Sequence, residues 1–194
     1  MGQILDARQQ AAGEACVAAI LAAGSTRLSV DDLRAAAGIS KRTFHRYFPY
    51  KAQAIRPHYA AMTANFAESL AAERLDSVES WTHAWAAVVL GPDPSRSLRL
   101  FELVRADAEF WSVFLEVVED GEREFAESLR HRTPSDPAAA DAQAAADLSL
   151  AADVTAVALV ASSRLALLAA TQEGRDPVEA FRSYLHAFDP PLVR

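Results

Sequence analysis

The sequence contains little cysteine, glycine or proline, and each shortage narrows the possible folds. Its single cysteine, Cys16, cannot form a disulfide bond within the 194-residue chain. Glycine and proline, which interrupt helices, number 7 and 9, whereas alanine, the strongest helix former, occurs 42 times. With 51% hydrophobic residues, the chain is also apolar enough to bury a core. We therefore expect an all-α globular protein.

Segments typical of secretion or membrane insertion are lacking as well. The first residues do not combine a positively charged start, an apolar run and a cleavage site. The most apolar stretch, residues 154–171, contains Arg164, and an arginine in the middle of a membrane costs about 3 kcal/mol. We interpret this stretch as a buried helix and expect a cytoplasmic protein that does not bind a membrane.

The sequence also has no motif for catalysis. The spacings Glu-x-x-His and His-Glu-x-x-His, which place metal ligands on helices, do not occur. The GxSxG, P-loop and dinucleotide-binding glycine patterns are absent too. We expect no enzyme, no catalytic residue, and neither a metal nor another cofactor.

Charge is divided unevenly along the chain, although its net value is −7. Residues 1–59 contain eight basic and four acidic side chains, so the remaining part has a net charge of −11. Both lysines, Lys41 and Lys51, fall in one 11-residue window together with Arg42, His45 and Arg46. This window predicts binding to a polyanion.

Hydrophobic spacing and local end signals predict about nine helices. Ser29 begins a capping-box pattern and Ser40 can cap the next helix, while Gly24 and Gly38 are stop signals. The resulting helices are expected at residues 3–23, 30–37, 41–48, 50–73, 78–90, 95–107 and 109–131, followed by a closing pair.

Three features of this pattern have more than one interpretation. Gly13 either weakens the first helix or makes room for a close neighbour. Pro57, inside the helix expected at residues 50–73, predicts a kink near Arg56 that is either a hinge or a rigid bend. The alanine-rich run at 138–147 is either a helix extension or a linker.

The closing pair of helices has the clearest apolar stripes. The first stripe includes Val154 and continues in steps of three or four, and the second begins at Val178 and ends at Phe188. Such stripes would face water in a single chain, so we expect them to form a homodimer. The expected interface residues are Val157, Ala161, Leu165, Leu168, Phe181 and Leu185.

All three tryptophans belong to the acidic part of the chain. Aromatic side chains at helical spacing usually pack in a core, but the interior of a helical bundle is also where ligand pockets form. The candidates for contact with a small, largely apolar effector are Trp81, Trp85, Phe101, Arg105, Trp111 and Phe114.

Two short helices around the turn 38–40 match the arrangement that places a recognition helix in the major groove of DNA. On the second of them, Lys41, Arg42, His45 and Arg46 share one side. The aromatic rings at positions 44 and 48 lie together on another side. One face is therefore rich in hydrogen-bond donors and the other belongs to the core.

The segment Gly38-Ile39-Ser40-Lys41-Arg42-Thr43-Phe44-His45-Arg46-Tyr47-Phe48-Pro49-Tyr50-Lys51 resembles the helix-turn-helix signature of the TetR family of bacterial transcription regulators. The resemblance covers about residues 3–59. It implies a DNA-binding domain at 1–58 and an effector-binding and dimerisation domain at 59–194. It further implies a homodimer that binds a palindromic operator in double-stranded DNA, usually as a repressor that a small molecule releases. The DNA contacts that it implies are Ser29, Lys41, Arg42, Thr43, His45, Arg46, Tyr47 and Lys51.

Two departures from the family pattern leave the base preference open. His45 stands where the family more often has an aromatic ring, and Ala52-Gln53-Ala54 stands where an acid usually follows the lysine. The alternative function is a scaffold for interaction and dimerisation that has this fold but does not bind DNA. Lys41, Arg42 and Lys51 argue against it, because such a scaffold does not need them.

Overall fold

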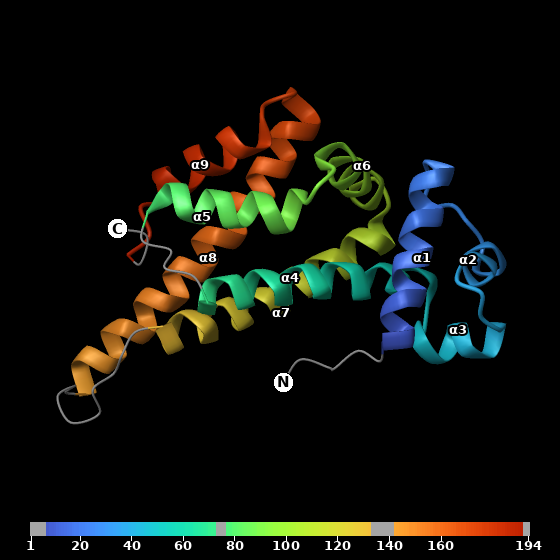
Figure 1. Ribbon diagram of the computed structural model, residues 1–194, viewed down its shortest axis with the longest axis horizontal. Helices are drawn as coiled ribbons and strands as arrows, with labels where there is room; N and C mark the ends of the chain where they lie inside the picture. Colours follow the sequence, from blue (N-terminus) through green and yellow to red (C-terminus); the bar gives the residue numbers. More distant parts are fainter. Residues whose placement is uncertain (1–6, 73–76, 133–141, 192–194) are drawn as a thin grey trace. The chain divides into compact units, whose positions relative to one another are not determined.

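A computed structural model describes residues 7–72, 77–132 and 142–191. These residues form nine α-helices and no strand, which confirms the all-α prediction (Figure 1). They divide into two compact units. The first unit contains the described residues up to Met62 together with Asp93–Asp120, and the second contains those from Thr63 to Pro92 and from Gly121 onwards.

The chain begins with three helices whose ends follow local signals. Helix α1 spans Ala7–Ala23, α2 spans Val30–Ala36 and α3 spans Lys41–Tyr47, close to the predicted ranges. Residues 3–6 of the first predicted helix lie outside the described residues. Ser29 and Asp32 form the expected capping box, and Ser40 caps α3. Gly24 and Gly38 follow α1 and α2 with φ of 61° and 64°, a conformation that favours glycine at helix ends.

The helix predicted from residue 50 to 73 begins later than expected. Residues Lys51–Ile55 form a 3₁₀ helix, and α4 spans Arg56–Ala72. Pro57 therefore lies in the first turn of α4. Backbone N–H groups have no partner within the helix at this position, so proline, which has no N–H, removes no hydrogen bond of α4. The helix type changes from 3₁₀ to α at Arg56, where the sequence predicted a kink, and the hinge at Pro57 stays a prediction.

Gly13 of α1 is explained by its neighbour. A Cβ atom at Gly13 would lie 2.7 Å from Cγ and 2.8 Å from Cβ of Pro57. Glycine thus lets the proline ring at the start of α4 approach the backbone of α1. Of the two interpretations, the close neighbour is the correct one.

We expect Gly13→Ala to lower the free energy of unfolding by about 1–3 kcal/mol, the cost of overpacking. At an unhindered helix position the same change raises the free energy of unfolding by up to about 1 kcal/mol. Denaturant unfolding followed by circular dichroism measures the difference. In a Pro57→Gly background most of the cost should vanish, because the ring atoms are gone. An unchanged or raised stability of Gly13→Ala would contradict this explanation of the contact.

Helix α6, Pro94–Arg105, and the first part of α7, Ala108–Arg132, complete the first unit. Arg56 of α4 pairs with Glu116 at 3.2 Å and with Asp120 at 2.5 Å, both on α7. The basic and acidic parts of the sequence therefore meet inside one compact unit. Its core includes the fully buried side chains of Ile20, Leu33, Phe44, Ile55, Val104 and Phe110.

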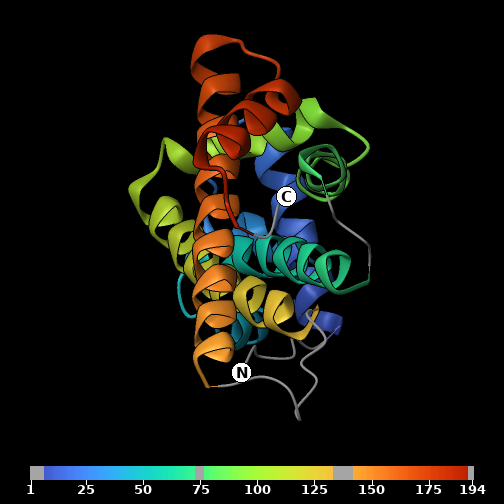
Figure 2. The same cartoon turned by 90° about the vertical axis from the view of Figure 1, so that its left-hand side faces the viewer.

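The second unit contains the closing helix pair. Helix α8 spans Ala142–Glu173, and α9, which spans Pro177–Phe188, lies along its C-terminal part (Figure 2). Between them, Gly174 has a φ of 68°. Residues 142–147 of the alanine-rich run are thus helical, whereas 138–141 lie outside the described residues.

The remaining helix of the second unit ends differently from the prediction. Helix α5 spans Val78–Trp85 and continues as a π-helix at Ala86–Leu90. The Trp85 ring stacks on Phe181 of α9 at 4.3 Å between ring centres, and its Nε1 donates a hydrogen bond to Oγ of Ser163 on α8 at 2.9 Å. Trp85 therefore joins three helices of the unit.

Helix α8 is the one described helix long and apolar enough to cross a membrane. Over Ala146–Glu173 its mean hydropathy is 1.7, and 44% of the stretch is buried within the chain. Arg164 on this helix is exposed, and Asp153 pairs with Arg130 of α7. The charged side chains argue against insertion into a membrane, because charge is costly in the hydrocarbon core.

Candidate nucleic-acid interface

Helix α3 presents four basic or ionisable side chains to solvent and buries the ring of Phe44. Lys41, Arg42, His45 and Arg46 are exposed. Phe44 on the opposite side is fully buried. The two faces predicted from the sequence are therefore present, and the first is defined here as the α3 face.

Contacts at both ends hold α3 in place. Ser40 Oγ accepts a hydrogen bond from the backbone N–H of Thr43 at 3.1 Å. At the other end, Gln9 Nε2 of α1 donates to the carbonyl of Tyr47 at 3.0 Å. The rings of Phe44 and Phe48 pack edge to face, 5.2 Å between centres. These contacts present the α3 face on a firmly anchored helix.

The expected hydroxyl contacts are partly engaged within the chain. Ser29 Oγ donates to Asp32 Oδ2 at 2.7 Å and accepts from the Asp32 backbone N–H at 3.1 Å. Thr43 is half-buried, with its Oγ1 2.9 Å from Oγ of Ser40. Tyr47 is half-buried beneath Arg46, whose guanidinium lies 5.1 Å from the ring centre. Ser29 therefore serves first as a helix cap.

Lys51 differs from the basic residues of α3. Its Nζ donates a hydrogen bond to the carbonyl of Thr26 at 3.0 Å and lies 5.5 Å from the centre of the Phe110 ring. The side chain is half-buried. The ammonium group that the resemblance assigns to DNA thus has partners inside the first unit.

Acidic side chains near the α3 face remain ionised. Arg34 Nε pairs with Asp31 at 2.6 Å. This hydrogen bond, followed by the charge of Lys41, lowers the pKa of the Asp31 carboxyl. Arg34 is therefore ion-paired within α2, unlike the basic side chains defined as the α3 face, for which no ion pair is found among the described residues.

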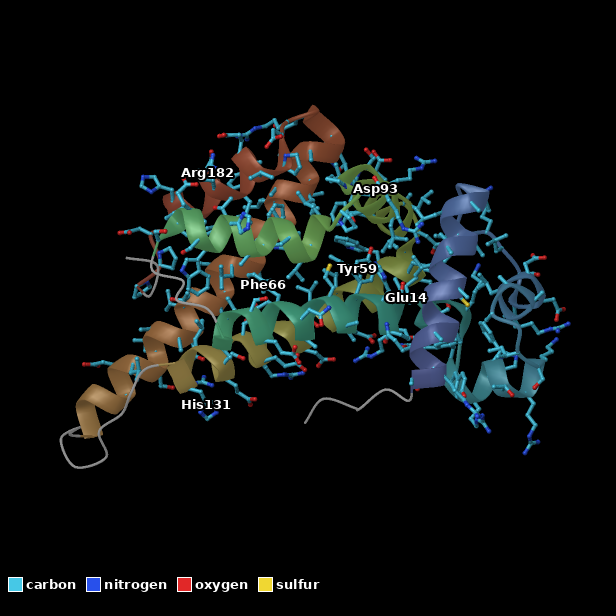
Figure 3. The ribbon with its side chains drawn as sticks, in the orientation of Figure 1. Glu14, Tyr59, Phe66, Asp93, His131 and Arg182 are labelled. Atoms are coloured by element: carbon cyan, nitrogen blue, oxygen red, sulfur yellow. The ribbon has the colours of Figure 1, made fainter. Side chains whose placement is uncertain are left out.

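A contact that the sequence did not indicate joins α1 to α4. Nδ1 of His58 lies 3.1 Å from both carboxylate oxygens of Glu14, a residue shown on α1 in Figure 3. Gln10 Nε2 donates to Glu14 at the same distance. The hydrogen bond with His58 is the main cause of a lowered pKa at Glu14. No local pattern predicts this pair, because its members are 44 positions apart.

The candidate effector residues fall into two groups. Trp81 and Trp85 are buried in the second unit. The others belong to the first unit, where the Trp111 and Phe114 rings stack at 4.9 Å and Phe101 meets both edge to face. Arg105 is exposed at the end of α6.

Tyr59, which the sequence analysis did not select, extends the aromatic group of the first unit. Its ring meets Phe114 edge to face at 5.0 Å. Its hydroxyl group is buried and has no hydrogen-bond partner among the described residues, and burial raises its pKa. One tyrosine in a helix gives no sequence signal for such a position.

The expected dimer residues differ in exposure. On α8, Val157 is 49% exposed, and Ala161, Leu165 and Leu168 are partly exposed. Phe181 and Leu185 on α9 are fully buried within the chain. Within the chain these two side chains belong to the protomer core, and their place in a dimer interface stays a prediction. Further large apolar side chains exposed in the second unit are Leu150, Val154 and Phe188.

Cys16 is a core residue. It is fully buried in α1, and its Sγ lies 3.7 Å from the carbonyl oxygen of Leu33. Burial raises the pKa of the thiol to about 11. Because the thiolate is the reactive form, burial and a raised pKa both lower the reactivity of Cys16 near neutral pH.

Comparison with known proteins gives a structural match. No protein-family model and no curated protein matches the sequence. The fold is similar to that of a crystal structure from Mesorhizobium loti assigned to the TetR family of transcriptional regulators. The two are 17% identical with a TM-score of 0.53, and the match covers 93% of this chain and 94% of the other. The protein therefore has the fold of a TetR-family regulator.

Proposed function

We propose that this protein is a DNA-binding transcriptional regulator. The observation that carries the proposal is the α3 face, on which Lys41, Arg42, His45 and Arg46 are exposed while Phe44 anchors the helix. Arginine and lysine donate hydrogen bonds to O6 and N7 of guanine in the major groove. The fold of the chain and its N-terminal excess of basic residues support the same function.

The side chains of the α3 face have separate roles in this proposal. Arg42 and Lys41 lie on the first turn of α3, the part of a recognition helix that contacts base edges. In this proposal Thr43 and Tyr47 donate to phosphate oxygens, which positions the helix without reading the base sequence. His45 contributes a ring nitrogen to base or phosphate contacts.

The proposal includes a homodimer, because two recognition helices are needed for a palindromic operator. Exposed apolar side chains support the α8 surface as the interface, with Val157, Ala161, Leu165 and Leu168 as contacts. Beside it, a groove of about 360 Å³ is lined by Glu122, Arg123, Ala126, Glu127, Arg130, Asp153, Ala156 and Val157.

We further propose repression in the cytoplasm that a small, largely apolar effector relieves. Two separate aromatic groups are candidates for contact with the effector. Phe101, Trp111 and Phe114 belong to the first unit, with Arg105 as a polar contact, and Trp81 and Trp85 belong to the second. The effector must bind more tightly to the form with lower DNA affinity, since equal affinity for both forms shifts nothing.

Selection from a pool of random duplexes tests DNA binding directly. The full chain should enrich a palindrome whose half-sites are centred one helical turn, or a multiple of it, apart. The matched control is the Lys41→Ala/Arg42→Ala variant, which keeps the buried side of α3 and should enrich nothing. If the wild type enriches no sequence more than this control does, the protein is the non-DNA-binding scaffold.

A further inference from the structure

Tyr59 of α4, labelled in Figure 3, has a buried hydroxyl group that the packing of the first unit leaves unused. The side chain is 6% exposed, and its Oη has no hydrogen-bond partner among the described residues. Buried tyrosine hydroxyls usually have a partner, because a donor that loses water without a replacement costs stability. A bound molecule is one explanation for such a group in a native protein.

This hydroxyl belongs to a connected set of aromatic rings. The Tyr59 ring meets Phe114 edge to face at 5.0 Å between ring centres. Phe114 in turn stacks on Trp111 at 4.9 Å and meets Phe101 at 5.7 Å. These four residues, Tyr59, Phe101, Trp111 and Phe114, are called the Tyr59 group. All are buried except Trp111, which is half-buried and so borders solvent.

Charge at the Tyr59 group indicates which ligand atom the hydroxyl can bind. Burial raises the pKa of Tyr59, so its hydroxyl stays protonated and is a donor near neutral pH. Arg56, three positions earlier on α4, pairs with Glu116 and Asp120, so its charge is already balanced within the unit. A carboxylate buried here would lose its hydration, and one hydroxyl does not replace that hydration. A neutral acceptor, such as a carbonyl oxygen, fits better.

The aromatic residues of the second unit make a weaker candidate. Trp85 already donates its Nε1 hydrogen bond to Ser163, and its ring stacks on Phe181. Ser162 on α8 also has a buried hydroxyl group without a partner among the described residues. A serine hydroxyl can turn toward a carbonyl of its own helix, whereas the rigid ring of Tyr59 holds Oη away from its own backbone. The unsatisfied tyrosine donor therefore favours the first unit.

We propose that the Tyr59 group is the effector site, and that Oη of Tyr59 donates a hydrogen bond to a neutral acceptor of an uncharged aromatic ligand. The neighbouring rings stack on the ligand or meet it edge to face. Entry displaces Trp111, because it is the member of the group that borders solvent. The inference rests on the proposed function, since it names the chemical class of the effector and the unit that binds it.

Two probes with the same pair of rings test the hydrogen bond in the full chain. Benzophenone has a carbonyl group where diphenylmethane has a methylene group, and isothermal titration calorimetry measures both affinities. The ratio of benzophenone to diphenylmethane affinity should fall about 10-fold in Tyr59→Phe, with diphenylmethane binding unchanged. The control Tyr184→Phe, in the second unit, should keep the wild-type ratio. An unchanged ratio in Tyr59→Phe, or no binding of either probe to the wild type, would overturn the proposal.

The stability of the ligand-free chain distinguishes a ligand donor from a structural one. Thermal unfolding of Tyr59→Phe should have the midpoint of the wild type or a higher one, because the hydroxyl has no partner to lose. A lowered midpoint would show that the hydroxyl is bound within the folded chain, by a water molecule for example, and would overturn the proposal.

Photochemical labelling locates the bound probe. Under near-ultraviolet light the excited carbonyl oxygen of benzophenone takes a hydrogen atom from a nearby C–H group, and the two carbon radicals join. Mass spectrometry of the digested chain should find the label on peptides that contain Tyr59, Phe101 or Trp111. A label confined to peptides that contain Trp81 or Trp85 would overturn the choice of unit.

None of these measurements uses DNA, so they separate the Tyr59 group from the proposed function. A chain that shows the expected probe binding but enriches no duplex would refute DNA binding alone. A chain that enriches a palindrome but binds neither probe would refute the effector site alone.

Discussion

Replacing Arg42 by alanine is expected to weaken operator binding by about 1–3 kcal/mol per half-site and to relax the base preference at one position of each half-site. Arg42 is exposed on the first turn of α3, where its guanidinium can donate two hydrogen bonds to a guanine. Its loss leaves the base without a partner, which changes preference as well as affinity. Competition binding with all four bases at each operator position measures both effects.

Arg34→Ala is the matched control for this experiment. It removes the same charge, but Arg34 already pairs with Asp31 at 2.6 Å on α2. We expect its loss to leave the base preference unchanged. If Arg42→Ala binds every operator variant as the wild type does, Arg42 does not read a base and the role given to the α3 face is wrong.

Phe181→Ala is expected to lower the free energy of unfolding by about 3–5 kcal/mol, the usual cost of removing a buried aromatic ring. Phe181 is fully buried, and its ring stacks on Trp85 with 3° between the ring planes. The substitution leaves a cavity between α5 and α9 and removes the stacking partner of Trp85. Denaturant unfolding followed by tryptophan fluorescence reports on both changes.

Val157→Asp tests the α8 surface as the dimer interface, because Val157 is exposed on α8 and lies outside the protomer core. A carboxylate in an apolar interface loses its hydration, so we expect a folded monomer at micromolar concentration in sedimentation. Val157→Ala should remain a dimer. A dimeric Val157→Asp would exclude this α8 surface as the interface. If Phe181→Ala is folded but monomeric, Phe181 contributes to the dimer interface, as its spacing in the sequence predicted.

Local signals in the sequence determined the ends of α1, α2 and α3. Ser29 and Ser40 cap α2 and α3, and Gly24 and Gly38 end the preceding helices, as their types and spacing predicted. These interactions join residues a few positions apart, so the sequence contains all the information they need. The same holds for the α3 face, because positions three and four apart share one side of any helix.

Only the tertiary structure decided which other segment of the chain contacts each apolar or charged side chain. Periodicity showed that Phe181 and Val157 lie on apolar stripes. It did not show that Trp85 of α5 covers Phe181 while Val157 stays exposed, because that depends on contacts between residues far apart in the chain. Gly13 and Pro57 explain each other only once α1 and α4 are in contact. Lys51 likewise donates its hydrogen bond to the carbonyl oxygen of Thr26, 25 positions earlier in the chain. Such pairings depend on how the helices pack, and packing is the sum of many weak non-local contacts that no short segment specifies.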